Sequence, residues 1–282
     1  MIKVICIYHG NCADGFASAW VVRKAYGMRP DHIDFVAGVY GQPPPPVGMW
    51  DDVVLVDFSY KRAVLEDLAT RARTLTIIDH HKTAAEDLAG LGSERRICTR
   101  FDMEHSAAIL TWQYYFGDKP PPELLLHIED RDLWRFALAG TREIQANVFS
   151  YPYDFAVWDE LMTRPVSDLL AEGRAIERKH FKDVHELIGV TTRRMVIGGH
   201  NVPIANLPYT LVSDAAHALC KNEPFAGCYW DTPRGRVFGL RSTDDGLDVS
   251  EIAKQYGGGG HRNASGFTVA YDKAQEFEVR VT

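Results

Sequence analysis

The chain has 282 residues, of which 46% are hydrophobic, with 31 basic and 38 acidic residues and a formal net charge of -7. A length of this order predicts roughly two domains, each long enough to bury a core. Proteins that hold long duplex nucleic acid by its backbone usually carry an excess of Lys and Arg, so the acidic balance argues against such a ligand. Ordinary solubility charge explains the value equally well.

The cysteine count and the N-terminal residues indicate in which cellular compartment the protein is expected. The five cysteines are an odd number and form no CxxC pair, which favours free thiols in a reducing cytoplasm over a disulfide framework. The N-terminal run reaches His9 without the parts of a signal peptide. No apolar run approaches the length of a membrane span. We therefore expect a soluble cytoplasmic protein with no membrane partner.

Apolar runs alternate with helical patterns through the first half of the chain. Strands are expected at residues 2–8, 34–39, 52–56 and 75–78. Helices are expected at residues 15–26 and 62–72, and a third from the prolines at 120–122 to about Glu129. Four prolines at 43–46 mark a surface loop. Alternating strands and helices predict an α/β domain with a parallel sheet.

The second half of the chain has a different pattern. A charged helical segment at 167–187 could link two domains. Beyond it, strands are expected at 194–197, 202–206, 226–230 and 237–241, and helices at 212–219 and 249–255. We therefore predict an α/β chain with a parallel-sheet domain at 1–165, a helical linker at 166–190 and a smaller mixed-sheet domain at 191–282.

Three of the predicted strands end in residues that can bind metals. These residues are His9, followed by Asp14; Asp57; and Asp79 with His80 and His81. In an open parallel sheet, ligands bind at the carboxyl ends of the strands. A lone Asp there is more often a helix cap and a lone His more often structural, but two adjacent histidines would each need a separate partner. His and Asp together suit Mn²⁺, whereas Mg²⁺ alone favours oxygen ligands.

A glycine-rich segment near the C-terminus is the second candidate site. Four consecutive glycines at 257–260 let the backbone approach a ligand closely. The two residues that follow add donors suited to a phosphate or a base edge. A flexible linker is the ordinary alternative, but the apolar run at 266–270 is typical of a strand. We expect a substrate contact from Gly258, Gly259, Gly260, His261 and Arg262.

Five segments, in order along the chain, resemble motifs of the DHH phosphoesterase superfamily with a C-terminal DHHA1 domain, of the nanoRNase or oligoribonuclease type. Asp79-His80-His81 resembles the signature of the family. Residues 9–15, 56–58 and 129–136 resemble its first, second and fourth motifs, and residues 257–267 resemble the glycine-rich DHHA1 motif. Each motif is weak alone, but five in order are specific.

The resemblance implies a role for each of these residues. Asp57 would bridge two metal ions, with His9 on the first ion and Asp14, His80 and Asp130 on the second. His81 would face the phosphate, and Asp79 would orient the histidines. Asp132 is the alternative to Asp130 if the fourth motif aligns differently.

One position departs from the family pattern. Where the common first motif carries another Asp, this chain has Cys12. The first ion could therefore use Asn11, Cys12 or water, and a Cys12 thiolate would favour Fe or Zn. A small buried residue is the ordinary alternative for Cys12.

The leading prediction is a phosphodiesterase with two Mn²⁺ ions (or Mg²⁺, Fe or Zn), in which an activated water attacks phosphorus. The expected substrate is a short nucleotide, such as the linear dinucleotide pGpG or a short oligoribonucleotide, held between the two domains. The alternatives are a phosphatase acting on 3′-phosphoadenosine 5′-phosphate or polyphosphate, and a non-catalytic nucleotide-sensing module. Base preference and a homodimer are left open.

Overall fold

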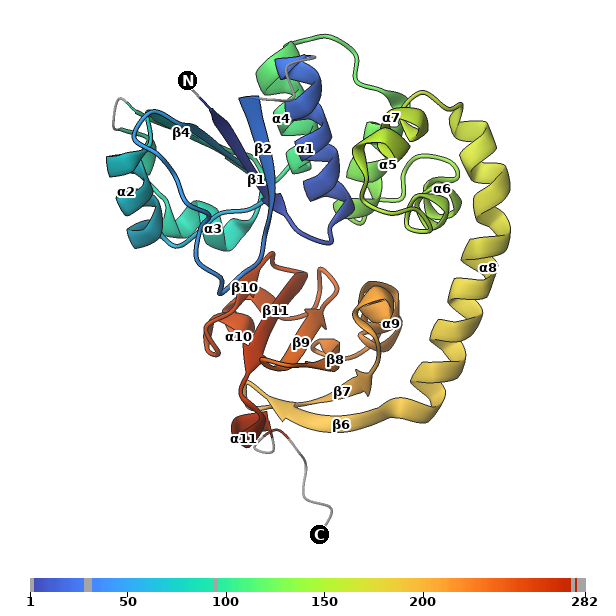
Figure 1. Cartoon of the computed structure of the whole chain (residues 1–282). Helices are drawn as coiled ribbons and strands as arrows, with labels where there is room; N and C mark the ends of the chain where they lie inside the picture. The colour runs from blue at the N-terminus through green and yellow to red at the C-terminus, as the bar shows by residue number, and fades with distance from the viewer. Residues whose placement is uncertain (1–2, 28–31, 94–95, 275–276, 278–282) are drawn as a thin grey trace. The chain divides into compact units, whose positions relative to one another are not determined.

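The computed structural model describes residues 3–27, 32–93, 96–274 and 277. The chain divides into two compact units, Met1–Glu177 and Arg178–Thr282. Helix α8 (Val166–Thr191) runs across this division, so the segment predicted as a helical linker belongs to one continuous helix (Figure 1). In the described part of the chain, no helix combines the length and the apolar character needed to cross a membrane.

The first unit is built on a parallel sheet, which within the described residues has five strands in the order β2-β1-β3-β4-β5. The strands are β1 (Val4–His9), β2 (Ile33–Gly38), β3 (Asp52–Val56), β4 (Thr74–Asp79) and β5 (Ile97–Phe101). Tyr8 pairs with Val56, and Val56 pairs with Ile78. This register brings the polar residues that end β1, β3 and β4 to one edge of the sheet.

Helices cover both faces of this sheet (Figure 1). On one face, α1 (Ala13–Tyr26) and α4 (Ala107–Phe116) pack against the apolar residues of β1 and β3. On the other face, α2 (Arg62–Arg71) packs through Leu65 and Leu68, and α3 (Lys82–Asp87) follows β4. Because both faces are buried, the strands read as continuous apolar runs rather than as alternating patterns.

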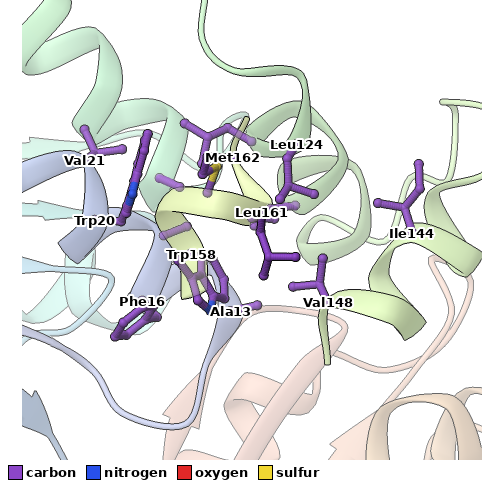
Figure 2. Packing of buried hydrophobic residues seen from close by; sticks show 14 of the residues in the cluster. Ala13, Phe16, Trp20, Val21, Leu124, Ile144, Val148, Trp158, Leu161 and Met162 are labelled. Carbon is purple, nitrogen blue, oxygen red and sulfur yellow. The ribbon is translucent and has the colours of Figure 1, made fainter. Parts of the chain in front are cut away.

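A further group of helices packs against α1 and α4 (Figure 2). These helices are α5 (Glu123–Asp132), α6 (Thr141–Val148) and α7 (Phe155–Leu161). Trp158 is fully buried among them, and its ring centroid lies 5.0 Å from that of Phe16 on α1. Asp159 on α7 also accepts hydrogen bonds from Trp20 and Arg23 of α1, each at 2.8 Å. These contacts fix the position of α1, which starts at the edge where the polar residues gather.

The second unit contains a mixed sheet, which in the residues that the structure describes has the order β10-β11-β9-β8-β7-β6. Its strands are β6 (Thr192–Ile197), β7 (His200–Asn206), β8 (Ala226–Thr232), β9 (Gly235–Arg241), β10 (Gly259–Gly260) and β11 (Ala264–Val269). Only the β7–β8 pair is parallel among these described pairs. The helices of this unit are α9 (Val212–Leu219), α10 (Val249–Lys254) and α11 (Tyr271–Ala274). The predicted fold class, a parallel-sheet domain followed by a smaller mixed-sheet domain, is confirmed.

Candidate metal centre

Asp57 lies at the centre of the polar edge of the first sheet. It directly follows β3, is buried, and has a left-handed backbone with φ of 55°. Its Oδ2 atom is 3.3 Å from His9 Nδ1, and its Oδ1 atom is 3.2 Å from His80 Nε2. Burial would raise the pKa of Asp57, but the hydrogen bonds from His80 and His9 hold it well below its usual value. One ionised carboxylate therefore lies between the histidine that ends β1 and the first histidine after β4.

His80 connects Asp57 with two more carboxylates. Its Nε2 atom lies 3.7 Å from Asp14 Oδ2 and 3.4 Å from Asp132 Oδ2. Burial and mutual repulsion raise the pKa of Asp14 and of Asp132. Burial would lower the pKa of His80, but the hydrogen bond with Asp57 and the neighbouring carboxylates raise it to about 10. Three carboxylates thus converge on one imidazole, and the group is short of positive charge.

Cys12 joins His9 and Asp57 in a second group of potential ligands. One ligand atom from each of the three residues lies within 4.8 Å of the others. Burial and the charge of Asp57 raise the pKa of the Cys12 thiol well above its usual value. Without a bound cation, Cys12 therefore stays a neutral thiol. The neighbouring Asn11 has a left-handed backbone with φ of 55°.

Two features of the backbone place His9 and Asp14. A Cβ atom on Gly15 would lie 2.4 Å from the carbonyl oxygen of His9, so only glycine lets α1 start this close behind β1. Asp14 Oδ2 accepts a hydrogen bond of 2.8 Å from Ala107 N, and Oδ1 accepts one of 3.0 Å from Ala108 N. Both donors belong to the first turn of α4, where the helix dipole favours a carboxylate.

Asp79 organises the two histidines that follow it. Its Oδ1 atom accepts hydrogen bonds from the backbone N–H groups of His80 and His81 at 2.7 and 3.2 Å, and lies 2.7 Å from His81 Nδ1. Among the described residues, its buried Oδ2 atom has no hydrogen-bond partner. Burial would lower the pKa of His81, but the charge and hydrogen bond of Asp79 outweigh this and raise it. Because His81 Nδ1 pairs with Asp79, a hydrogen bond from the ring to a substrate would come from Nε2.

Asp130, expected in the metal group, does not lie there. Its Oδ1 accepts a hydrogen bond from Ala137 N at 2.7 Å, and its Oδ2 accepts from Leu138 N at 3.0 Å and from the Thr141 hydroxyl at 2.6 Å. Asp132, the alternative, lies beside His80 with Asp14. Residues two positions apart on a helix point about 200° apart, so only one of the pair can face the sheet edge.

Asp130 is hydrogen-bonded to the loop that follows α5. The chain turns sharply there, and Arg135 N and Phe136 N both donate to the carbonyl oxygen of Asp130. Trp134 and Phe136 have left-handed backbones, with φ of 56° and 48°, which are rare for aromatic residues. Asp130 therefore holds a strained loop, with its main chain and its side chain, next to the group that contains Asp132.

In the second unit, the glycine-rich segment has a structural requirement of its own. β10 pairs with β11 at Gly266 and Ser265. A Cβ atom on Gly258 would lie 2.1 Å from the carbonyl oxygen of Gly266, and Gly260 has φ of 140°. The glycines therefore permit a close strand pair, whatever else they bind.

Arg262 is also used within the second unit. Its Nη2 atom donates to the carbonyl oxygens of Asp244 and Gly246, each at 3.0 Å. The sequence did not predict these contacts, which hold the turn before α10. A contact of Arg262, His261 or the glycines with a substrate stays a prediction.

Comparison with known proteins gives one relative in sequence. No protein-family model matches the chain. An uncharacterized protein of Acanthamoeba polyphaga mimivirus is 31% identical over 283 residues, which cover 93% of this chain and 66% of the relative. The chain therefore spans slightly less than two thirds of the length of this curated relative.

Comparison with solved structures concerns the fold. A pGpG-specific phosphodiesterase from Vibrio cholerae superposes with a TM-score of 0.50 at 17% identity, covering 97% of this chain and 95% of that one. RecJ from Thermus thermophilus, solved with Mn²⁺, superposes with a TM-score of 0.53 at 15% identity, covering 97% of this chain and 50% of RecJ. At these identities the likeness is one of fold: a unit built on a parallel sheet is followed by a unit built on a mixed sheet, as in the fold of the DHH superfamily.

Proposed function

We propose that this chain is a divalent-metal-dependent phosphoesterase that holds two ions around Asp57. The position of the Asp57 carboxylate carries the proposal. Its Oδ2 atom faces His9 at 3.3 Å, while its Oδ1 atom faces His80 at 3.2 Å. A carboxylate placed between two groups of ligands suits a pair of ions about 3.5–4 Å apart, the spacing of two-metal hydrolytic sites.

The residues present fit such ions. His9 and Asp57, with Cys12 beside them, would hold the first ion, and Asp14, Asp57, His80 and Asp132 would hold the second. Imidazole and carboxylate ligands together suit Mn²⁺ and similar ions. The raised pKa values of Asp14 and Asp132 indicate a deficit of positive charge, which a divalent cation would remove.

His81 and Asp79 would act on the phosphoryl group. When bound, the two ions would supply the Lewis acidity that activates water and polarises the ester. The bond between Asp79 and His81 Nδ1 fixes the ring and raises its pKa, which favours a protonated His81. Its Nε2–H can then donate a charge-assisted hydrogen bond to a phosphoryl oxygen as negative charge develops there. Asp79 acts through His81 and is a positioning residue.

The substrate that we propose is a short nucleotide phosphodiester, cut to mononucleotides. The formal net charge of -7 disfavours a long duplex ligand. The shared fold with a pGpG-specific phosphodiesterase, over 95% of that chain, supports a dinucleotide of this kind. The segment Gly258, Gly259, Gly260, His261 and Arg262 would hold the part of the substrate that is not cut.

One assay tests the proposed function. Purified protein with Mn²⁺ is offered linear dinucleotides, longer oligoribonucleotides, cyclic dinucleotides, 3′-phosphoadenosine 5′-phosphate and polyphosphate, with Asp57→Asn as the inactive control. We expect mononucleotides to form fastest from linear dinucleotides. If the protein hydrolyses only polyphosphate or only 3′-phosphoadenosine 5′-phosphate, that compound is the substrate in place of the proposed dinucleotide. If the protein binds nucleotides but hydrolyses none of them with Mn²⁺, Mg²⁺, Fe²⁺ or Zn²⁺, it is a nucleotide-sensing module and not an enzyme.

A further inference from the structure

Tyr40 is an exposed aromatic residue at the edge of the candidate metal centre. It lies two residues beyond the end of β2, and 54% of its surface is exposed. The end of β2 is held against the loop after β1 by a hydrogen bond of 3.0 Å from Gly10 N to the carbonyl oxygen of Gly38. The ring centroids of Tyr40 and His9 lie 5.5 Å apart with an interplanar angle of 69°. The Tyr40 ring therefore stands next to the His9 ligand position.

A buried ring supports Tyr40 from below. Phe58, which follows Asp57, is fully buried, and its ring centroid lies 4.7 Å from that of Tyr40 with an interplanar angle of 38°. A Cβ atom on Gly38 would lie 2.7 Å from the Phe58 ring, so the glycine makes room for it. The residue after the central carboxylate thus fixes the position of the Tyr40 ring.

These contacts do not make Tyr40 a core residue. A tyrosine with a structural role usually buries its ring and hydrogen-bonds its hydroxyl. Tyr256 follows this rule, because its hydroxyl accepts a hydrogen bond of 2.8 Å from Gly198 N. Over residues 3–27, 32–93, 96–274 and 277, the Tyr40 hydroxyl makes no hydrogen bond, and its ring contacts are with His9 and Phe58. What remains is a half-exposed aromatic ring, anchored by Phe58, beside a candidate group of metal ligands.

We propose that Tyr40 is a stacking platform for a nucleobase of the substrate. Base–aromatic stacking tolerates any base, because every base presents a flat π-face. The platform would bind the base attached to the phosphoester that lies at Asp57, and it would favour nucleotides over polyphosphate. This inference rests on the proposed function and adds a specificity-determining residue to it.

The test compares Tyr40 variants on substrates with and without bases. The first substrate is a linear dinucleotide, and the second is a phosphodiester of the same two ribose units without bases. Loss of one stacked base predicts that Tyr40→Ala raises KM for the dinucleotide by about five- to a hundredfold. Little change is expected in kcat or on the abasic ester. Tyr40→Phe should behave like the wild type, and Tyr40→Leu should fall between.

A matched control and a binding measurement complete the test. Trp50 is 69% exposed and lies two residues before β3, at the opposite end of that strand from Asp57, so Trp50→Ala should leave KM unchanged. Calorimetry with a mononucleotide and Mn²⁺ should show the same fold-loss in Tyr40→Ala and none in Tyr40→Phe. Thermal unfolding of each variant checks that the protein is folded.

Each other result counts against the platform. An equal loss on the abasic ester would show that Tyr40 acts at the phosphate. An equal loss in Tyr40→Phe would assign the effect to the hydroxyl. Undiminished mononucleotide binding in Tyr40→Ala, or no binding by the wild type, would also overturn the inference. If the wild type hydrolyses no ester, the proposed function fails, and calorimetry still decides the role of Tyr40.

Discussion

The hydroxyl of Thr141 donates a hydrogen bond of 2.6 Å to Asp130 Oδ2, and this bond closes the loop that follows α5. The same hydroxyl lies 2.8 Å from His127 Nδ1, so a short chain of hydrogen bonds crosses from α5 to the start of α6. Asp130 also accepts from the backbone N–H groups of Ala137 and Leu138. The carboxylate of Asp130 is fully engaged in the fold, while Asp132 faces the other potential ligands.

This division predicts opposite phenotypes for two neighbouring carboxylates. Asp130→Ala leaves two backbone donors and one hydroxyl without their acceptor, so we expect the free energy of unfolding to fall by about 1–3 kcal/mol. Asp132→Ala should lower the content of bound Mn²⁺ and the turnover while leaving the unfolding free energy of the metal-free protein nearly unchanged. Urea unfolding in chelator and metal analysis of the two variants provide the measurement. Metal loss confined to Asp130→Ala would reverse the assignment.

Substitutions of the two histidines that follow Asp79 should have different effects on turnover and on metal content. His81→Ala should lower kcat by roughly a hundred- to a thousandfold, the usual effect of removing one donor to a developing negative charge, with metal content near normal. His80→Ala should reduce metal content, because Nε2 of His80 faces three carboxylates. The measurements are steady-state kinetics on a dinucleotide and metal analysis of the same preparations.

A suitable control for the histidine pair is His185→Ala. His185 is exposed on α8, and its ring Nδ1 lies 2.6 Å from the backbone oxygen of Phe181. We expect this variant to keep both turnover and metal. Equal metal loss in His80→Ala and His81→Ala would disprove the proposed division of roles.

Cys12 predicts a preference among metals. Because the Cys12 thiol is held protonated by burial and by Asp57, Cys12→Ser should leave Mn²⁺ affinity almost unchanged. Cys12→Asp introduces the carboxylate that the first motif of the DHH superfamily commonly carries and should tighten Mn²⁺ binding, while the metal-free protein loses stability from the added repulsion. Titrations with Mn²⁺ and Zn²⁺ of the three proteins measure both effects. A collapse of Mn²⁺ binding in Cys12→Ser would show instead that the sulfur is a required ligand.

Asp159 predicts a pH dependence of stability that is independent of the metal centre. Burial would raise the pKa of Asp159, but the hydrogen bonds from Arg23 and Trp20 lower it below the unfolded value. Its contribution is therefore complete above the unfolded pKa, about 3.9, and is lost as the pH falls through the lower folded value. Since the side chain is 41% exposed, we expect less than about 1 kcal/mol.

Urea unfolding of the wild type and Asp159→Asn in chelator, from about pH 3 to pH 7, measures this contribution. The difference between the two proteins should be largest near neutral pH and should shrink in acid. Asp118→Asn is the control, because Asp118 is exposed and has no ion pair within the described part of the chain. A difference that stays constant across this range would argue against a lowered pKa for Asp159.

The sequence predicted the positions of His9, Asp57 and Asp79 well, because each directly follows or ends an apolar run that could only be a buried strand. Parallel pairing then brings them together, which the register of β1, β3 and β4 confirms. In the second unit, β6 to β9 and helices α9 and α10 were predicted to within two residues, because their apolar patterns are clear. The short elements β10 and α11 were not predicted.

Other parts of the site could not be read from the sequence. α4 was missed, because its residues are apolar nearly all round and show no amphipathic period. Its contact with Asp14 joins residues 93 and 94 positions apart, and no local pattern reports such a distance. The choice between Asp130 and Asp132 depends on the phase of α5 and on the loop that follows it. A single sequence does not carry that information.

If the proposed ions bind, left-handed backbones near the candidate metal centre would link the stability of the fold to the supply of ions. Asn11, Asp57, Trp134 and Phe136 all have positive φ, and such conformations cost on the order of 1–3 kcal/mol each for residues other than glycine. A ligand that binds only the folded chain offsets this cost in proportion to the logarithm of its concentration. The folded fraction of this protein should therefore follow the free concentration of divalent cation, so that ion starvation depletes the folded protein as well as its activity.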